Sequence, residues 1–232
     1  MAKKTTGGKN RIYIIDDHPI VREGLSQFLS GQKDFTIAGH SEGGRQALEH
    51  IGSLKADAVI VDLNLKDMSG LDLIREIHAK RPELPILVLS MHEESLYAER
   101  ALRAGAKGYL MKSEAVEKVA EALRQILAGQ VFAGQGLTTK LLKRLTGPSN
   151  KPESSPVERL SDRELEVFQL LGQGMTTRRI AERLGRSIKT IETYRENIKR
   201  KLDLKNAVEL VYYAVQWSGQ KGPVAAPATT PS

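Results

Sequence analysis

Residues 11–127 alternate between short apolar runs and segments with helical spacing, and this alternation constrains the fold more than any other feature. Five near-continuous apolar runs are typical of strands buried on both faces: Ile12–Ile15, Phe35–Ala38, Ala58–Val61, Ile86–Leu89 and Tyr109–Met111. Five segments between and after them have helical spacing: Val21–Leu29, Gly44–Ile51, Leu71–Ala79, Ser95–Leu102 and Val116–Leu127. This pattern predicts an α/β fold, a doubly wound five-stranded parallel sheet with helices on both faces.

Polar residues follow four of these predicted strands. Asp16 and Asp17 end the first strand, Asp62 the third, Ser90 the fourth and Lys112 the fifth. Parallel sheets of this kind place their binding sites outside the carboxyl ends of the strands. We therefore expect these side chains to converge at one edge of the sheet, although they lie far apart in the chain.

Three clustered carboxylates repel one another unless a cation neutralises them. A hard divalent ion, with Mg²⁺ as the first choice, prefers such an oxygen-rich site. With the ion bound, Asp62 has the chemistry of a nucleophile that forms an aspartyl phosphate. Lys112 would offset charge on the transferred oxygens, and the Ser90 hydroxyl would donate a hydrogen bond to one of them.

Several separated motifs resemble the receiver domain of two-component response regulators. They are IIDDHP at 14–19, VDLNLKDMSG at 61–70, LSM at 89–91 and GAKGYLMKS at 105–113. The resemblance covers about residues 10–130. It implies a flavodoxin-like receiver fold, Mg²⁺ as the cofactor and a sensor histidine kinase as the partner.

Carried over residue by residue, the resemblance implies a role for each polar group. Asp62 resembles the phosphoacceptor, Ser90 the switch hydroxyl and Tyr109 the switch aromatic, while Lys112 would contact the phosphoryl group. The implied metal ligands are Asp16, Asp17, Asp62 and the backbone carbonyl of Asn64. Ser113 departs from the pattern, because many receivers have a proline there whose preceding peptide is cis. A cis peptide before a non-proline residue costs roughly 2.5–4 kcal/mol, so the geometry of the Lys112–Ser113 bond stays open.

Two other classes of protein fit parts of this pattern. A phosphohydrolase with a carboxylate nucleophile would also use Asp62 and Mg²⁺, but Asn64 occupies the position where such enzymes usually carry a second acid. A DNA-binding regulator that works without phosphorylation would keep the fold and leave the acidic site idle. No Walker motif or kinase signature occurs, so the phosphoryl donor comes from outside and we expect no enzyme. The five histidines form no pair at metal-ligand spacing on one helix, and His18 only borders the acidic pair.

The net charge of +7 is unevenly distributed along the chain. Residues 11–129 hold 15 basic and 18 acidic residues, whereas residues 157–217 hold 12 basic and 9 acidic ones. An acidic part followed by a basic part indicates two separate tasks.

A segment rich in proline and poor in apolar residues, 147–156, indicates an extended linker between these parts. A short amphipathic helix is possible just before it, at 139–145. The predicted organisation is a receiver domain at 10–130, a linker at 131–156, a second domain at 157–217, and disordered ends at 1–9 and 218–232.

The sequence contains no cysteine, which excludes disulfides and thiolate metal sites. No apolar run reaches the roughly 18–20 residues needed to span a bilayer, and no signal peptide is evident after Met1. We therefore expect a cytoplasmic protein without a membrane partner.

The basic part begins with a capping box, in which Ser161 is the N-cap and Glu164 stands at N3. A first helix follows, and a second is expected over Thr177–Leu184. Ser187 caps a third helix over about 188–202. Two short helices joined by a glycine turn, the second strongly basic at its end, are typical of a helix-turn-helix.

Spacing separates two faces of the third helix. The expected core side contains Ile188, Ile191, Ile198 and Leu202. Between Arg178 and Lys205 there are ten basic and four acidic residues, a net +6, which favours contacts with DNA phosphates. The candidate DNA-contacting residues are Lys189, Thr190, Glu192, Thr193, Glu196, Lys199 and Arg200.

This region resembles the LuxR-type four-helix DNA-binding domain. The motifs are LSDRE at 160–164, IAERL at 180–184, SIKTIETY at 187–194 and NIKRKL at 197–202. Joined to a receiver, the resemblance implies the NarL/FixJ class of response regulators and a transcription regulator that binds DNA. It also implies that the last helix, Asn206–Trp217, forms a homodimer through Val208, Val211, Tyr212 and Val215.

Two positions depart from the LuxR-type pattern. Tyr194 stands where a histidine is common, and Glu192 stands where a lysine often reads guanine. An acid at that position would accept from cytosine N4 instead. The target DNA sequence should therefore not be copied from a relative.

Overall fold

The computed structural model describes residues 8–91, 94–134 and 156–219. The chain divides into two compact units, Met1–Thr146 and Gly147–Ser232. The possible helix at 139–145 lies outside the described residues, as do 1–7 and 220–232 of the predicted disordered ends. No helix within the described ranges is long and apolar enough to cross a membrane.

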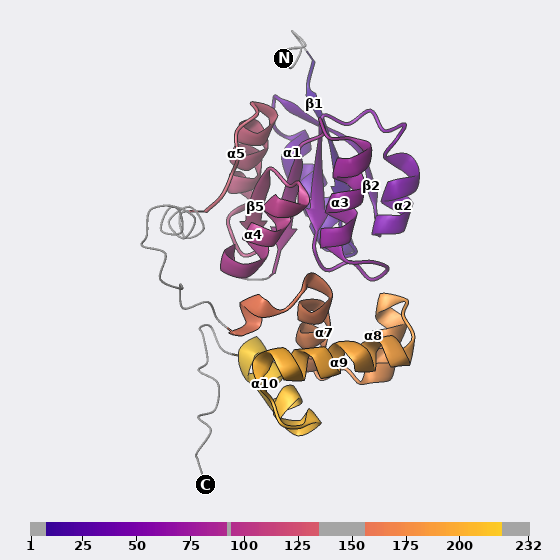
Figure 1. Cartoon of the computed structure of the whole chain (residues 1–232). Helices are drawn as coiled ribbons and strands as arrows, with labels where there is room; N and C mark the ends of the chain where they lie inside the picture. The colour runs from indigo at the N-terminus through magenta and orange to yellow at the C-terminus, as the bar shows by residue number, and fades with distance from the viewer. Residues whose placement is uncertain (1–7, 92–93, 135–155, 220–232) are drawn as a thin grey trace. The chain divides into compact units, whose positions relative to one another are not determined.

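The first unit is the predicted α/β fold, with five parallel strands in the order β2-β1-β3-β4-β5. The strands are β1 Asn10–Ile15, β2 Phe35–Ser41, β3 Ala58–Asp62, β4 Ile86–Ser90 and β5 Gly108–Met111. The helices are α1 Pro19–Ser30, α2 Gly44–His50, α3 Gly70–Lys80, α4 Glu94–Ala104 and α5 Val116–Leu127. Helix α1 contacts α5, whereas α3 contacts both α2 and α4, so the helices form two groups (Figure 1).

Alternation along β1 explains why both faces of the sheet are covered. Ile12 and Ile14 belong to an apolar cluster that includes Leu25 of α1 and Leu123 of α5. Tyr13, between them, is also buried but lies outside that cluster, because successive side chains of a strand point to opposite faces. The central strands β3 and β4 are buried at every position, as their continuous apolar runs predict.

The edge of β5 is covered by the residues that follow α5. Phe132 forms an isolated parallel bridge with Gly108. Its backbone carbonyl accepts from the Tyr109 N–H at 3.1 Å, and its N–H donates to the Lys107 carbonyl at 2.9 Å. The half-buried Phe132 also packs against the apolar cluster, so this edge strand does not present all of its backbone groups to solvent.

The order of the strands positions a crevice for a site. Strand β1 lies between β2 and β3, so the chain leaves β1 toward one side of the sheet and returns on the other. Ligands bind at such a switch point, outside the carboxyl ends of the strands. Gly70, at the start of α3, allows the loop after β3 to turn tightly, since a Cβ there would lie 2.7 Å from the Asp62 carbonyl oxygen.

The second unit is all-helical. It contains the 3-10 turn η1 Pro156–Arg159 and the helices α7 Asp162–Gly172, α8 Thr177–Leu184, α9 Ile188–Leu202 and α10 Ala207–Gly219. Phe168 of α7 is fully buried and lies against Tyr213 and Trp217 of α10, with ring centroids 5.8 and 5.6 Å away. Helix α8 packs on α9 in the order expected for a helix-turn-helix.

The predicted caps are confirmed. The Ser161 side chain accepts from the Glu164 N–H, and the Glu164 carboxylate accepts from the Ser161 N–H at 2.7 Å. Ser187 caps α9 by accepting from the Thr190 N–H at 3.1 Å. These bonds satisfy N–H groups that would otherwise have no partner at the start of each helix.

The prediction that Ile188 belongs to the core of the helical unit is wrong. Ile188 is 52% exposed, whereas Ile191, Ile198 and Leu202 are buried as expected. At about 3.6 residues per turn, Ile188 lies roughly 60° to the side of Ile191. It is also the first residue of α9, so no preceding helical turn covers it.

Candidate functional site

The predicted polar groups meet at the carboxyl edge of the sheet. Asp16 and Asp17 follow β1, and Asp62 is the last residue of β3; all three are buried. Atoms of these carboxylates and of His18 lie within 4.8 Å of one another. Convergence of the three carboxylates is therefore confirmed, and parallel strand order is the cause.

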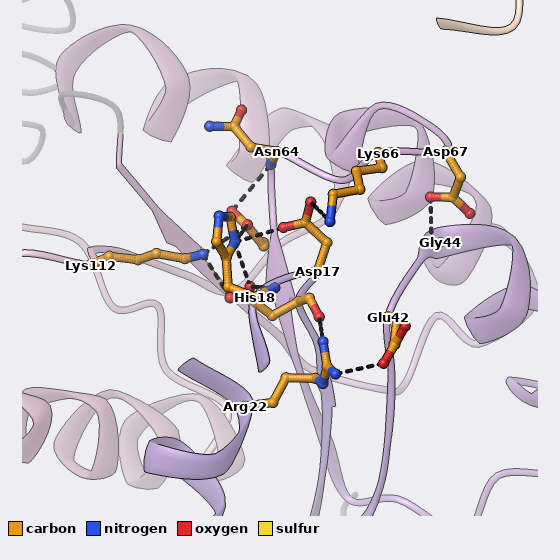
Figure 2. Close-up of polar contacts among 11 residues, drawn as sticks. Asp17, His18, Arg22, Glu42, Gly44, Asn64, Lys66, Asp67 and Lys112 are labelled. Atoms are coloured by element: carbon orange, nitrogen blue, oxygen red, sulfur yellow. Dashed lines mark hydrogen bonds and ion pairs between the residues drawn. The ribbon is translucent and has the colours of Figure 1, made fainter. Parts of the chain in front are cut away.

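Lys112, which follows β5, joins two of these carboxylates. Its Nζ lies 2.7 Å from Asp16 Oδ2 and 2.8 Å from Asp62 Oδ2, and its side chain is only 8% exposed (Figure 2). Asn64 contributes its backbone N–H, which donates to Asp62 Oδ1 at 3.1 Å. The two oxygens of Asp62 thus face an ammonium group and a backbone amide.

Burial and charge oppose each other at this site. Burial raises the pKa of Asp62, and the carboxylate of Asp16 raises it further, while Lys112 lowers it without reversing the net rise. For Lys112, burial lowers the pKa, but the charges and hydrogen bonds of Asp62 and Asp16 outweigh burial and raise it overall. The ammonium therefore stays charged, and only part of the carboxylate repulsion is relieved.

Asp17 has the least compensated carboxylate of the three. Its Oδ1 is buried and receives no hydrogen bond among the described residues. The Nδ1 of His18 lies 2.6 Å away, but this contact lacks hydrogen-bond geometry. The exposed Lys66 ammonium is 3.6 Å from Oδ2. A buried oxygen without a hydrogen bond is costly, which makes this edge suited to a cation.

His18 is closer to the site than its position beside the acidic pair indicated. Its Nδ1 lies 3.2 Å from Asp16 Oδ1 and 3.9 Å from Asp62 Oδ2, and its side chain is 60% exposed. The backbone N–H of His18 donates to Asp16 Oδ1 at 2.9 Å. The sequence signal was adjacency to Asp17, but adjacency alone does not set the direction of a ring.

Two side chains that support the site, Arg22 and Asp67, were not among the residues predicted from the sequence. The buried Arg22 donates from Nη1 to the Asp16 carbonyl at 2.7 Å and from Nη2 to Glu42 Oε1 at 2.7 Å. The Asp67 carboxylate accepts from the Gly44 N–H at 3.0 Å and ties the loop after β3 to the start of α2 (Figure 2). No local pattern identifies the pairs Arg22–Glu42 and Gly44–Asp67, because their partners lie 20 and 23 residues apart in the chain.

Ser90 and Tyr109 are fully buried on neighbouring strands. Ser90 ends β4, and its carbonyl accepts from the Lys112 N–H at 2.7 Å. Tyr109 pairs with Val88 in the register of β4 and β5. The Lys112–Ser113 peptide is trans, as are all peptide bonds in the described ranges, so the cis geometry left open above is not adopted.

A second surface lies on α9. Five of the candidate DNA-contacting residues are exposed on the side of α9 opposite the buried Ile191 and Ile198. They are Lys189, Glu192, Thr193, Glu196 and Arg200. Two other candidates, Thr190 and Lys199, are half-buried. Lys199 forms an ion pair with Glu196 at 2.9 Å, and Arg195 contacts Glu192 at 3.3 Å. Both acidic side chains of this face thus have a basic neighbour.

Helix α10 has an apolar outer face. Val208 is 78% exposed and Tyr212 is 64% exposed, with Val211 and Val215 beside them at 38% and 44%. On the inner face, Leu210, Tyr213 and Ala214 are buried against the rest of the unit. The four predicted dimer residues therefore share one uncovered face.

Two family models match separate parts of the chain. The response regulator receiver domain matches residues 12–124, and the luxR family of bacterial regulatory proteins matches residues 158–214. The oxygen regulatory protein NreC of Staphylococcus haemolyticus (strain JCSC1435) is 36% identical over 210 residues, which cover 89% of this chain and 97% of NreC.

Solved structures of the response regulator RcsB also align with this chain. RcsB from Salmonella enterica serovar Typhimurium, bound to promoter P1flhDC in the presence of the phosphomimetic BeF₃⁻, aligns with a TM-score of 0.66 at 28% identity and covers 90% of this chain and 100% of its own. A second RcsB structure, on conformational dynamism for DNA interaction, has a TM-score of 0.69 at 27% identity and covers 90% and 98% of the two chains. The chain therefore belongs to the NarL/FixJ class of two-component response regulators, which join a receiver domain to a LuxR-type DNA-binding domain.

Proposed function

We propose that this protein is a phosphorylation-controlled transcription regulator in which Asp62 accepts a phosphoryl group from a sensor histidine kinase. The environment of Asp62 carries the proposal. Its carboxylate ends β3, next to a second carboxylate and 2.8 Å from the Lys112 ammonium. A carboxylate nucleophile beside a fixed cation suits the formation of an aspartyl phosphate.

Asp16, Asp17, Asp62 and the backbone carbonyl of Asn64 would hold Mg²⁺. The buried Asp17 Oδ1 without a hydrogen bond supports this fit, as does a donor set of oxygen atoms. When bound, the ion would supply positive charge against the oxygens of the phosphoryl group.

Transfer would begin when an Asp62 oxygen attacks the phosphorus of a phosphohistidine. A bond from phosphorus to Asp62 forms, the phosphorus–nitrogen bond breaks, and the imidazole leaves with that electron pair. The Lys112 ammonium would then pair with phosphoryl oxygens in place of the Asp62 carboxylate. The Ser90 hydroxyl would donate a hydrogen bond to another of these oxygens.

The proposed signal passes from Ser90 to Tyr109, which lie on neighbouring strands. Movement of the Ser90 hydroxyl toward the phosphoryl group would permit a new rotamer of Tyr109 and alter the receiver surface. This change would favour a dimer or release the DNA-binding domain. Phosphorylation can shift the equilibrium between the inactive and active conformations only by the difference in free energy with which the two conformations stabilise the phosphoryl group.

DNA would meet α9. Lys189 and Arg200 are exposed basic residues of that helix, and the RcsB structure with promoter P1flhDC supports the same use here. Two domains paired through the apolar face of α10 would bind half-sites about 10 bp apart. Such a regulator would act in the cytoplasm, where the DNA and the kinase's catalytic domain are available to it.

Phosphorylation by acetyl phosphate with Mg²⁺ tests the proposal directly. Intact-mass spectrometry of the wild type should show the gain of one phosphoryl group, and Asp62→Asn should show none. Ser69→Ala, at a buried serine that is not one of the clustered carboxylates or Lys112, should be phosphorylated like the wild type.

DNA binding supplies the second half of the test. Beryllofluoride with Mg²⁺ should increase the affinity of the wild type for selected promoter DNA and leave Asp62→Asn unchanged. Equal DNA affinity with and without beryllofluoride would favour the phosphorylation-independent regulator instead. Multiple turnover on a phosphomonoester would favour the phosphohydrolase.

A further inference from the structure

We propose that the acidic pocket also binds borderline divalent transition-metal ions such as Co²⁺ and Zn²⁺, with His18 Nδ1 as a nitrogen ligand beside the carboxylates. The inference rests on the proposed function, because it uses the same carboxylates as the Mg²⁺ site. It adds one residue, His18, and a second class of ion.

The separations of the candidate ligand atoms fit a single ion. His18 Nδ1 lies 2.6 Å from Asp17 Oδ1 and 3.2 Å from Asp16 Oδ1. One ligand atom from each of Asp16, Asp17, His18 and Asp62 lies within 4.8 Å of the others. Ligands at about 2.0–2.2 Å from one ion are at most about 4.4 Å apart and about 2.8–3.1 Å apart at right angles. The longest separation must therefore contract slightly and the 2.6 Å separation of His18 Nδ1 from Asp17 Oδ1 must widen slightly.

The buried Asp17 Oδ1 is a second observation that favours a cation at this edge. The Asp17 side chain is 5% exposed, and its Oδ1 receives no hydrogen bond from the part of the chain that the structure describes, although His18 Nδ1 lies 2.6 Å away. Two potential ligand atoms this close together, without hydrogen-bond geometry, could share one cation after a slight separation. Leaving such an oxygen buried and unsatisfied is unfavourable, and an ion would remove that cost.

The backbone keeps His18 beside the carboxylates. The His18 N–H donates to Asp16 Oδ1 at 2.9 Å, and the His18 carbonyl accepts from the N–H groups of Val21 and Arg22 in the first turn of α1. The ring itself is 60% exposed, so ions from solvent can reach it. Figure 2 shows the His18 ring beside Asp17. A fixed backbone with an accessible ring is a favourable arrangement for a ligand at the mouth of the pocket.

The chemistry of the ligands sets the selectivity. Imidazole nitrogen suits Zn²⁺ and neighbouring transition ions, whereas Mg²⁺ prefers oxygen ligands only. His18 should therefore contribute to the binding of Co²⁺ or Zn²⁺ and contribute nothing to that of Mg²⁺. This difference separates a ligand role from a structural one.

Metal titrations of the untagged full-length protein test the inference. Co²⁺ is followed by its visible absorption and by calorimetry, and Mg²⁺ by calorimetry. His18→Gln should weaken Co²⁺ binding about tenfold or more, because even changes to groups that only orient a metal ligand typically lower metal affinity by about that factor. The same variant should leave the Mg²⁺ affinity unchanged. His50→Gln, at an exposed histidine in the last turn of α2, should behave like the wild type toward both ions.

The outcomes distinguish this inference from the proposed function. Equal Co²⁺ affinity and absorption in the wild type and His18→Gln would overturn the role of His18 while the Mg²⁺ site stands. Loss of Mg²⁺ binding in His18→Gln would also overturn it, since the residue would then act on the whole pocket. If the wild type binds neither ion, both the inference and the proposed metal site fail. Asp17→Asn should weaken binding of both ions.

Discussion

The Lys112 ammonium lies 2.8 Å from Asp62 Oδ2 and bridges the ends of β5 and β3 across 50 positions of sequence. The same ammonium is 2.7 Å from Asp16 Oδ2. Lys112 therefore supplies much of the positive charge that this pocket needs before any cation binds.

Asp62→Asn should stabilise the metal-free protein. Burial in the folded state raises the pKa of Asp62. Protonation of Asp62 therefore contributes its full share to the free energy of unfolding below the ordinary aspartate pKa. This contribution is lost as the pH rises through the raised pKa. At neutral pH in EDTA, the neutral side chain should raise Tm by a few degrees, since about 1 kcal/mol corresponds to roughly 4 °C in a domain of this size. A Tm below that of the wild type at neutral pH would contradict this expectation.

Lys112→Met should have the opposite effect. Removing one partner of a buried ion pair leaves its carboxylates uncompensated and costs about 3–5 kcal/mol. Urea unfolding in EDTA should show this loss, and Mg²⁺ should recover more stability in the variant than in the wild type. Lys118→Met is the control, because that exposed lysine of α5 pairs with Glu114 just before the helix and its replacement should change little.

Ser161→Ala should destabilise the helical unit alone. Loss of an N-cap side chain costs about 1 kcal/mol. Trp217, the single tryptophan, packs against Phe168 and reports the unfolding of this unit by fluorescence. Ser53→Ala, at an exposed serine of the first unit, should leave the transition in place. An unchanged midpoint in Ser161→Ala would mean that the cap contributes nothing.

Arg200→Ala should weaken DNA binding more than Lys199→Ala does. Arg200 is exposed, whereas the Lys199 side chain is 19% exposed and pairs with Glu196. Loss of one phosphate contact should lower the salt slope by about 1. Fluorescence anisotropy at several salt concentrations measures both quantities, with Lys118→Ala as the control. The reverse order of effects would place the phosphate contacts elsewhere on α9.

Val208→Glu should weaken dimer formation on DNA without changing the stability of the monomer. The side chain is 78% exposed on the apolar face of α10, so a charge there is tolerated until another copy covers it. Sedimentation with DNA carrying two half-sites should show fewer dimers. Val131→Glu makes the same change at a residue that is 56% exposed in the first unit and should have no such effect. Equal dimer content in both variants would contradict the assignment of α10.

Much of the fold follows from local pattern. Every predicted strand forms within a few residues of its expected bounds, because continuous apolar runs such as Val59–Val61 have no favourable place outside a covered sheet. The capping box at Ser161 and Glu164 forms for the same local reason, since both partners lie three residues apart. The prediction that Ile188 is buried was wrong, because the spacing of apolar residues on a helix does not show where the neighbouring helices end.

The residue pattern alone was enough to predict the sheet and the helical unit, and it put Asp16, Asp17 and Asp62 at strand ends that parallel order brings together. Which charges pair there depends on the packing of distant segments and could not be predicted from the pattern. The bridge from Lys112, the proximity of the His18 ring and the cover of Phe132 on β5 depend on side-chain directions and on distances between distant segments. Apolar spacing records which face of an element is buried, whereas such contacts are set by how the packed elements meet.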